Sequence, residues 1–256
     1  MPTGSRSWVK HYPSAALCQT AAANHQWLAS LDAPVPQLRA IDDKDLVFDH
    51  VTGRHAQPAD LPQLASLLGQ LHLRAYIADL REARLGQPHT TRTGLAIPDF
   101  LTSRRSAVLD LLSKRAVPSA PLTAAQAERE LDKATNGPAC FYKDSNPRNF
   151  LITTTGTKPG CVFVDFDTLT LAPIGYDLAK LIVTLAMTYG PLPAAAIQRA
   201  LDNYNNSFKD GLTDLGPVRW DELMRSVNIH HILTGPYLGH GGYRYAWTGH
   251  LRFPSP

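Results

Sequence analysis

Two short apolar segments, each followed directly by an acidic loop, constrain the fold of this chain most. Residues 140–142 lead into a loop that contains Asp144 and Asn149, and residues 161–164 lead into Asp165. Both segments have the length and composition of buried strands. Loops on a rigid scaffold commonly carry function, so the sequence predicts carboxylate and amide groups presented together.

These side chains suit phosphoryl transfer. A carboxylate such as Asp144 can orient an attacking hydroxyl and accept its proton, and the oxygens of Asn149 and Asp165 can hold Mg²⁺ against the β- and γ-phosphates. Residues 144–149 are also typical of a simple turn, because Asp, Asn, Ser and Pro are the residues that turns use. The surrounding motifs decide between the two interpretations.

Five fragments, in order along the chain, resemble motifs of the aminoglycoside phosphotransferase and choline kinase family. Residues 142–149 (YKDSNPRN) resemble its H-G-D-x-x-P-x-N loop, residues 164–167 (VDFD) its metal loop, and residues 176–179 (YDLA) match its Y-D-L-A helix start. Residues 68–72 resemble its L-x-x-L-H helix, and residues 46–53 its hinge. Each fragment alone is weak, but five in the right order are a strong indication.

The resemblance implies an α+β, two-lobed, protein-kinase-like fold with an abbreviated N-terminal lobe and a mostly helical C-terminal lobe. Residues 1–51 would form the nucleotide-binding lobe, with a hinge at about residues 49–53. Residues 52–256 would form the catalytic and substrate-binding lobe. Local patterns agree, because periodicity and punctuation predict helices and strands at these places: helices at 15–31, 61–71, 124–134, 177–185 and 193–208, and strands at 7–10, 37–41 and 46–48.

The same resemblance assigns roles in the catalytic and metal loops. Asp144 would be the catalytic base, with Lys143 beside it as a second catalytic residue. Asn149 and Asp165 would hold Mg²⁺.

The remaining roles concern the nucleotide and the support of the site. Lys10 would contact the α- and β-phosphates of ATP or GTP, and the base would lie against the backbone of Asp49, His50 and Val51. Three residues would act as structural support: Tyr142, Asp167 and Asp177.

The catalytic loop departs from the family pattern at two positions. Tyr142 replaces the usual His, and it keeps the ability to donate a hydrogen bond. Lys143 replaces the usual Gly and places a cation next to Asp144 in the sequence. We expect this cation either to stabilise the phosphates or to lower the pKa of Asp144.

The N-terminal region departs as well. The partner of Lys10 should be a Glu on the following helix, but no Glu occurs between Met1 and Arg81, which leaves Asn24 or Thr20 as the polar substitute. Only nine residues precede Lys10, too few for a two-stranded Gly-rich lid over the phosphates. Such a lid would be missing, truncated or lost to a misassigned start.

Composition excludes several classes of protein. The 256 residues are 44% hydrophobic with a net charge of +3, which suits a chain with a sizeable core and not a disordered one. No apolar run reaches about 18 residues, and neither a signal peptide nor a long basic run is evident, so we expect no membrane span and no nucleic-acid partner. The three cysteines form no C-x-x-C motif, which favours a reducing cytoplasm.

The function predicted from these features is transfer of a nucleotide γ-phosphate to a hydroxyl of a small molecule: an antibiotic, sugar, nucleoside or amino alcohol. Basic residues slightly outnumber acidic ones after residue 100, which argues against a pocket for polycationic aminoglycosides. The alternative is a catalytically impaired kinase-fold binding protein that lacks the Gly-rich lid. Retention of Asp144, Asn149 and Asp165 opposes that alternative.

Overall fold

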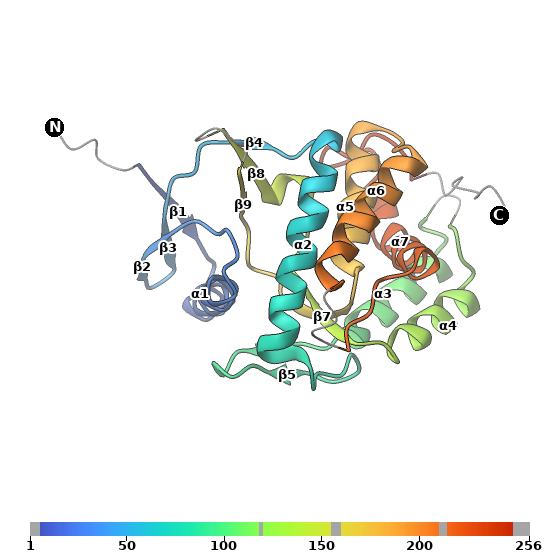
Figure 1. Ribbon diagram of the computed structural model, residues 1–256, viewed down its shortest axis with the longest axis horizontal. Coiled ribbons are helices and arrows are strands. Elements are labelled where there is room, and N and C mark those ends of the chain that lie inside the picture. The colour runs from blue at the N-terminus through green and yellow to red at the C-terminus, as the bar shows by residue number, and fades with distance from the viewer. Residues whose placement is uncertain (1–5, 118–119, 155–159, 210–213, 248–256) are drawn as a thin grey trace.

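A three-stranded antiparallel sheet with one helix forms one end of the molecule (Figure 1). The structure is a computed structural model and describes residues 6–117, 120–154, 160–209 and 214–247. Strands β1 (Ser7–His11) and β2 (Leu38–Asp42) flank β3 (Asp45–Asp49), giving the order β1-β3-β2. In the described residues β1 is therefore an edge strand. The expectation that the Gly-rich lid is missing or truncated concerns the residues before Lys10, and residues 1–5 of these lie outside the described part.

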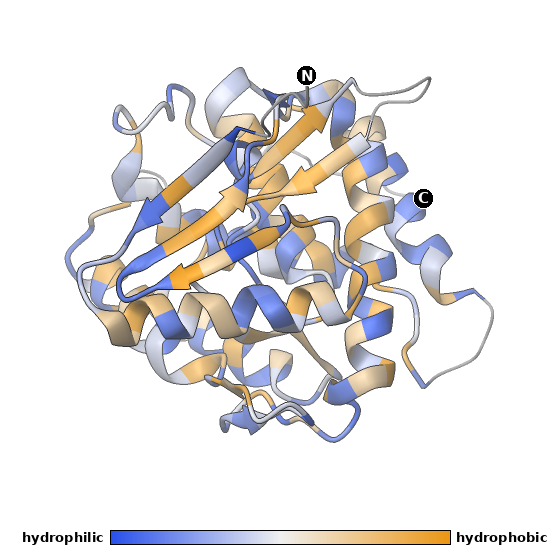
Figure 2. Cartoon of the chain, turned by 90° about the vertical axis from the view of Figure 1, so that its left-hand side faces the viewer, coloured by the Kyte–Doolittle hydropathy of each residue, from blue (hydrophilic) through white to orange (hydrophobic). Residues whose placement is uncertain are grey.

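Helix α1 (Ala15–Ser30) packs against this sheet. It begins where the Ser14 side chain accepts a hydrogen bond from the backbone N–H of Leu17, and it buries an apolar face that includes Trp27 and Leu28. Figure 2 looks onto this end of the molecule, where α1 runs across the view below the strands.

Three further pairings of strands position the two acidic loops. Strand β7 (Ala139–Tyr142) pairs with β10 (Thr170–Pro173), and β8 (Phe150–Thr153) pairs with both β9 (Gly160–Phe163) and β4 (Arg54–His55). The loop with Asp144 connects β7 to β8, and the loop with Asp165 connects β9 to β10. The short β5 (His89–Thr90) and β6 (Ala96–Ile97) form a separate hairpin.

The described residues also form the helices α2 (Leu61–Ala75), α3 (Leu101–Ser113), α4 (Ala124–Ala134), α5 (Tyr176–Tyr189), α6 (Ala194–Asn205) and α7 (Trp220–Thr234). Single helical turns lie at Pro58–Asp60, Tyr76–Leu80, Pro147–Asn149, Asn206–Phe208 and Gly235–Tyr237. No helix in the described ranges is both long and apolar enough to cross a membrane.

Helix α5 is the central helix, since every residue from Tyr176 to Met187 is buried. It starts after Gly175, which has φ +84°, a left-handed conformation that glycine adopts without steric cost. The Gly175 N–H donates to the hydroxyl of Tyr204 on α6 at 3.0 Å. The start of α5 is thus fixed, and with it the positions of Asp177 and Lys180.

The structure confirms most elements predicted from the sequence, including the helix at 124–134, where Thr123 and Gln126 form a capping box. Helices α3 and α7 and strand β10 were not predicted. Their sequences lack a clean apolar period, and their burial depends on neighbours that are distant in the chain.

Candidate active site

The two acidic loops share an unusual backbone feature. Asp144 has φ +63° and Asp165 has φ +66°, the left-handed region that costs a non-glycine residue of the order of 1 kcal/mol. The loops also touch, because the Val164 N–H donates to the carbonyl of Asn149 at 2.9 Å. Strain of this kind concentrates at functional sites.

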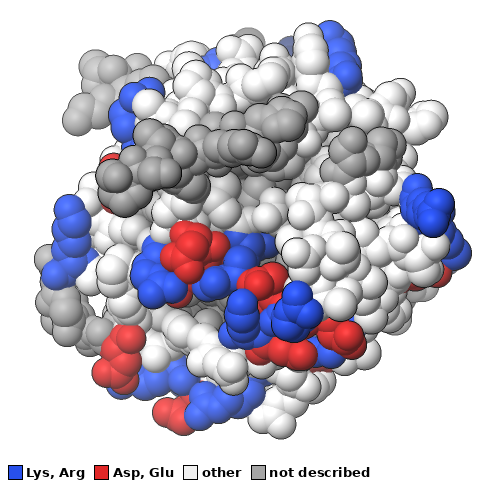
Figure 3. All heavy atoms as spheres, turned by 90° about the vertical axis from the view of Figure 1, so that its right-hand side faces the viewer, with Lys and Arg blue, Asp and Glu red and all other residues white. Residues whose placement is uncertain are grey.

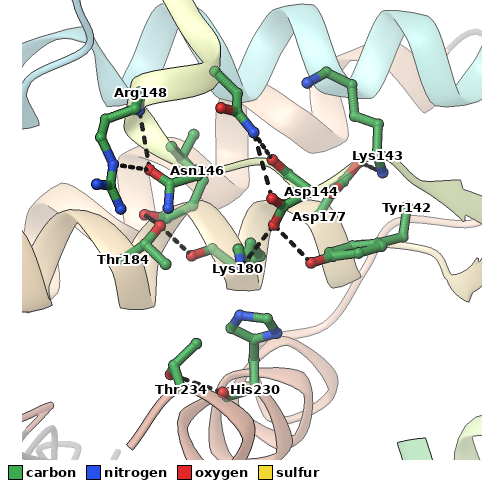
Figure 4. Close-up of polar contacts among 12 residues, drawn as sticks. Tyr142, Lys143, Asp144, Asn146, Arg148, Asp177, Lys180, Thr184, His230 and Thr234 are labelled. Carbon is green, nitrogen blue, oxygen red and sulfur yellow. Dashed lines mark hydrogen bonds and ion pairs between the residues drawn. The ribbon is translucent and has the colours of Figure 1, made fainter. Parts of the chain in front are cut away.

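Asp144 is held by three neighbours (Figure 4). Its Oδ1 lies 2.8 Å from Nζ of Lys180 and accepts a hydrogen bond from the Tyr142 hydroxyl at 2.9 Å. The Asn149 side-chain amide donates to the Asp144 carbonyl at 2.8 Å and lies 3.4 Å from Oδ2. Oδ2 is therefore the less engaged of the two carboxylate oxygens.

The surroundings keep Asp144 ionised. Burial raises the pKa of its carboxyl group, but the Lys180 ammonium and the Tyr142 hydroxyl together lower the pKa further than burial raises it. The net result is a pKa below the usual value for Asp. A carboxylate in this state can accept a hydrogen bond from an approaching hydroxyl.

Lys180 was not among the residues singled out in the sequence. It lies one helical turn after Asp177 on α5, and its side chain is 9% exposed. The spacing between Asp177 and Lys180 could have indicated it. Residues three apart on a helix share a face, and Asp177 was already expected to support the loop from behind.

The structure corrects the expected position of Lys143. Its side chain is fully buried, with Nζ 5.0 Å from the ring centroid of Phe150 and 4.9 Å from that of Phe163, and Nζ makes no hydrogen bond to a described residue. Burial lowers the pKa of this amine, and its charge is a minor influence on Asp144 compared with that of Lys180. Lys143 points into the core, so it is not placed to bind the phosphates of a nucleotide.

Asp177 lies behind the loop that carries Asp144. It is fully buried, and its Oδ2 accepts a hydrogen bond from the Lys143 backbone N–H at 3.3 Å and lies 3.6 Å from Nε2 of His72. His72 is also fully buried and shares a 2.6 Å hydrogen bond with the hydroxyl of Tyr204. These contacts place Asp177 where the expected structural support is needed.

Lys10 joins the N-terminal sheet to the second acidic loop. Its Nζ lies 2.7 Å from Oδ1 of Asp165 and 2.7 Å from Oδ2 of Asp167. Burial lowers the pKa of Lys10, and the two carboxylates raise it by more. Asp167 also accepts a hydrogen bond from the Tyr12 hydroxyl at 2.9 Å.

The expected substitutes for the missing Glu do not contact Lys10. Asn24 instead donates to the carbonyl of Phe166 at 2.8 Å, and the Thr20 hydroxyl donates to Ala16 within its own helix. The reason is that the Asp165 loop comes within reach of Lys10 and supplies two stronger, charged partners. Asn24 still contributes to the site, since it holds the backbone of that loop.

The donor set suits Mg²⁺. Asn149 uses its amide nitrogen toward Asp144, which leaves Oδ1 available, and the Asp165 side chain is 44% exposed. Mg²⁺ in nucleotide sites is held by one or two protein oxygens together with phosphates and waters. The described ranges contain no group of three or more His, Cys, Asp or Glu side chains placed to hold a metal.

The expected hinge lies at the end of β3. The Asp49 carboxylate pairs with both Nε and Nη2 of Arg39, at 2.7 and 2.6 Å. The His50 N–H donates to the carbonyl of Arg6 at 2.9 Å, so it already has a partner. The Val51 backbone follows directly after the sheet.

The rings of Tyr142, Tyr176 and His230 pack together next to Asp144, and we call them the aromatic wall. The guanidinium of Arg104 lies 4.8 Å from the ring centroid of Tyr142 and 5.3 Å from that of Tyr176. The Tyr176 hydroxyl lies 3.2 Å from Nδ1 of His230, a fully enclosed imidazole. Burial, reinforced by the charges of Lys180 and Arg104, holds the pKa of His230 well below its usual value, so this imidazole is neutral.

A separate hollow of about 220 Å³ lies between α4 and α7, beyond this wall. Figure 3 faces that side of the molecule, where side chains of both charges gather, and Arg225 of α7 pairs there with Glu130 of α4 and with Asp221. Its lining includes Tyr176 but no residue of the loop that carries Asp144.

Solved structures of small-molecule kinases share this fold. The amicoumacin kinase hAmiN, in complex with AMP-PNP, Ca²⁺ and Ami, superposes with a TM-score of 0.58 at 13% identity, covering 91% of this chain and 74% of that one. An ethanolamine kinase from Plasmodium vivax gives 0.56 at 12% identity, with 93% and 73% covered. An aminoglycoside-3'-phosphotransferase of type VIII gives 0.53 at 18%, with 90% and 86% covered. The predicted kinase-like α+β fold is confirmed.

The family follows from the sequence itself. A model of the phosphotransferase enzyme family matches residues 3–211, most of the chain, so the protein belongs to that family. This confirms the resemblance found in the five fragments. No curated relative matches the sequence.

Proposed function

We propose that this protein transfers the γ-phosphate of ATP or GTP to a hydroxyl group of a small molecule. The observation that carries the proposal is the Asp144 carboxylate, which is held ionised by Lys180 in a strained loop that touches the loop of Asp165. Phosphoryl transfer depends mostly on positioning and electrostatic stabilisation, and this arrangement supplies both.

Asp144 is the proposed general base. Oδ1 is engaged by Lys180 and Tyr142, so Oδ2 is the oxygen that receives the hydroxyl proton. The hydroxyl oxygen forms a bond to the γ-phosphorus while the bond from that phosphorus to the β,γ-bridging oxygen breaks. The electron pair leaves with the nucleoside diphosphate, and the proton remains on Asp144.

The nucleotide would lie between the sheet and the helical part, with residues 1–51 and 52–256 as the two lobes and Asp49 to Val51 as the hinge. Mg²⁺ would be held by Asn149 and Asp165, and it supplies neutralisation of charge on the phosphates. Lys10 would bind the α- and β-phosphates. To do so, its ammonium group would give up its contact with one of the two carboxylates that it pairs with, Asp165 or Asp167. The bound AMP-PNP and Ca²⁺ of hAmiN support nucleotide and divalent cation use.

The direct test follows the γ-phosphate. The protein is incubated with γ-labelled ATP or GTP, Mg²⁺ and a panel of hydroxyl compounds, and labelled products are separated. Transfer by the wild type and its loss in Asp144→Asn support the proposal. Equal transfer by Asp144→Asn contradicts the role of Asp144.

A second candidate, nucleotide binding without turnover, is favoured by one observation. Lys10 bridges Asp165 and Asp167 at 2.7 Å each, so the proposed metal ligand is already engaged by an ammonium group. Tight Mg²⁺–nucleotide binding with no transfer to any compound of the panel would support this candidate.

A further inference from the structure

The side of Asp144 that faces α5 and the C-terminal segment is cationic. Lys180 comes from α5 and Arg148 from the loop that carries Asp144, and Figure 4 shows the Arg148 side chain next to Asn146. The carboxylate of Asp144 neutralises the ammonium group of Lys180. Among the described residues, no carboxylate forms an ion pair with Arg148.

Arg148 is held in place by uncharged groups. Its Nε lies 3.4 Å from Oδ1 of Asn146, and its guanidinium lies 5.6 Å from the ring centroid of Tyr243. Asn146 is buried and donates in turn to the Tyr243 hydroxyl at 2.6 Å, so the support is anchored. The remaining N–H groups of the Arg148 guanidinium form a planar fork, and this geometry binds a carboxylate or phosphate with two hydrogen bonds.

The acidic residues of α5 and α7 are already engaged, because Asp177 is fully buried and Asp221 and Glu222 pair with arginines. Residues 178–201, which include most of α5, and residues 223–256, which include most of α7 and the segment of Tyr243, contain neither Asp nor Glu. A polycationic acceptor would therefore meet the charges of Lys180 and Arg148, with Asp144 already paired to Lys180.

We propose that the acceptor is a hydroxyl compound that also carries a carboxylate or a phosphate, and that Arg148 binds this anionic group. The proposal rests on the phosphotransferase function proposed above. Arg148 lies in the same loop as Asp144, so a molecule held by the fork at one end presents a hydroxyl to Oδ2 of Asp144 at the other. Binding of the anion fixes the orientation of the hydroxyl, which is how positioning lowers the barrier to transfer.

The test uses sets of acceptors that share one hydroxyl scaffold and differ only in a second group: carboxylate, phosphate, amide or ammonium. Glycerate, glycerol 3-phosphate, glyceramide and 3-amino-1,2-propanediol make one set, and gluconate, glucitol 1-phosphate, gluconamide and glucamine another. Transfer of labelled γ-phosphate gives kcat and KM for each, and calorimetry in the presence of Mg²⁺ and the nucleoside diphosphate measures binding without turnover. Separate carboxylate and phosphate arms identify which anion is bound.

We expect the anionic members to have the highest kcat/KM and the tightest binding. In Arg148→Gln, the KM and Kd of the anionic members should rise about 10- to 100-fold, because a hydrogen bond to a charged group is lost, and the preference over the amide should disappear. Arg148→Lys keeps the positive charge but not the planar fork, so its KM and Kd for the anionic members should lie between those of the wild type and Arg148→Gln. Arg199→Gln removes an exposed charge on α6 and should retain the preference.

The outcomes separate the two proposals. Ammonium or amide members that are phosphorylated as well as the anionic ones overturn the anionic acceptor and leave the phosphotransferase function standing. Anionic members that bind wild type but not Arg148→Gln, with no transfer at all, support the anion site and overturn the proposed function. Anion binding that is equal in wild type and Arg148→Gln, or undetectable in both, overturns the role of Arg148.

Discussion

Nζ of Lys180 lies 2.8 Å from Oδ1 of Asp144, and this ion pair joins the central helix α5 to the loop after β7. Lys180 is nearly enclosed, whereas Asp144 is 36% exposed on the side where an acceptor would approach. The pair fixes the carboxylate in one orientation and favours its charged form. In the proposed reaction, Lys180 would thus act through Asp144.

Replacing Lys180 by Met should move the acid limb of the pH–activity profile to higher pH. Removal of the ammonium raises the pKa of Asp144, so the carboxylate becomes protonated, and inactive as a base, at a higher pH than in the wild type. The measurement is kcat/KM for phosphate transfer from pH 4 to pH 9. Lys180→Arg keeps the charge and should keep the limb close to its original position. An unchanged limb in Lys180→Met would show that another group sets the ionisation of Asp144.

Asp144→Asn should lower turnover by about 10²- to 10⁴-fold, the usual contribution of a positioned general base. Asn tolerates the left-handed backbone at this position, so the loop conformation is preserved and the change isolates the loss of the base. Nucleotide affinity, measured by calorimetry, should stay within about threefold of the wild type. Asp202→Asn on the exposed face of α6 is the matched control, and turnover of that variant should not change. A strong loss of nucleotide affinity in Asp144→Asn would indicate a role at the metal instead.

Asp165→Asn should remove most of the Mg²⁺-dependent part of nucleotide affinity, by more than about tenfold, which corresponds to about 1.4 kcal/mol. The substitution deletes a charged oxygen ligand and keeps a residue that tolerates φ +66°. Asn149→Ala should weaken affinity less, because it removes a neutral ligand. Calorimetry with ATP or GTP, with and without Mg²⁺, gives both values. The metal assignment fails if Mg²⁺ strengthens nucleotide binding equally in Asp165→Asn and the wild type.

The orientation of Lys143 shows what local geometry could have corrected. In an extended chain, successive side chains point to opposite sides, so Lys143, which directly follows β7, is expected to face away from Tyr142. The structure follows this rule, since the Tyr142 hydroxyl donates to Asp144 and Lys143 packs against Phe150 and Phe163. Of the two roles expected for Lys143, the charge does lower the pKa of Asp144, although less than Lys180 does, whereas the buried position of the ammonium contradicts a role at the phosphates.

The partners of Lys10 could not be predicted from local pattern. Asp165 and Asp167 are more than 150 residues away in the sequence, and their contact with Lys10 depends on how the sheet of β1 sits against the β9–β10 loop. The motifs located the order of the strands and loops correctly. They did not predict the partners in each ion pair, because these depend on distances between elements that are far apart in the sequence.

The enclosed His230 gives a prediction for stability. Its pKa in the folded protein lies well below the usual value, because of burial and the charges of Lys180 and Arg104, with a smaller contribution from His231. Below about pH 6.5 the unfolded chain binds a proton at this histidine and the folded protein does not, so the free energy of unfolding falls as the pH falls, by up to about 1.4 kcal/mol per pH unit.

Urea unfolding at pH 7.5, 6.5 and 5.5 measures this slope. His230→Gln, which keeps a hydrogen-bonding side chain, should reduce the slope by about 1 kcal/mol per unit between pH 6.5 and 5.5, whereas His55→Gln at an exposed position should leave it unchanged. If His230→Gln loses stability on acidification as steeply as the wild type, His230 accepts a proton in the folded state and the aromatic wall next to Asp144 carries a charge that this structure does not predict.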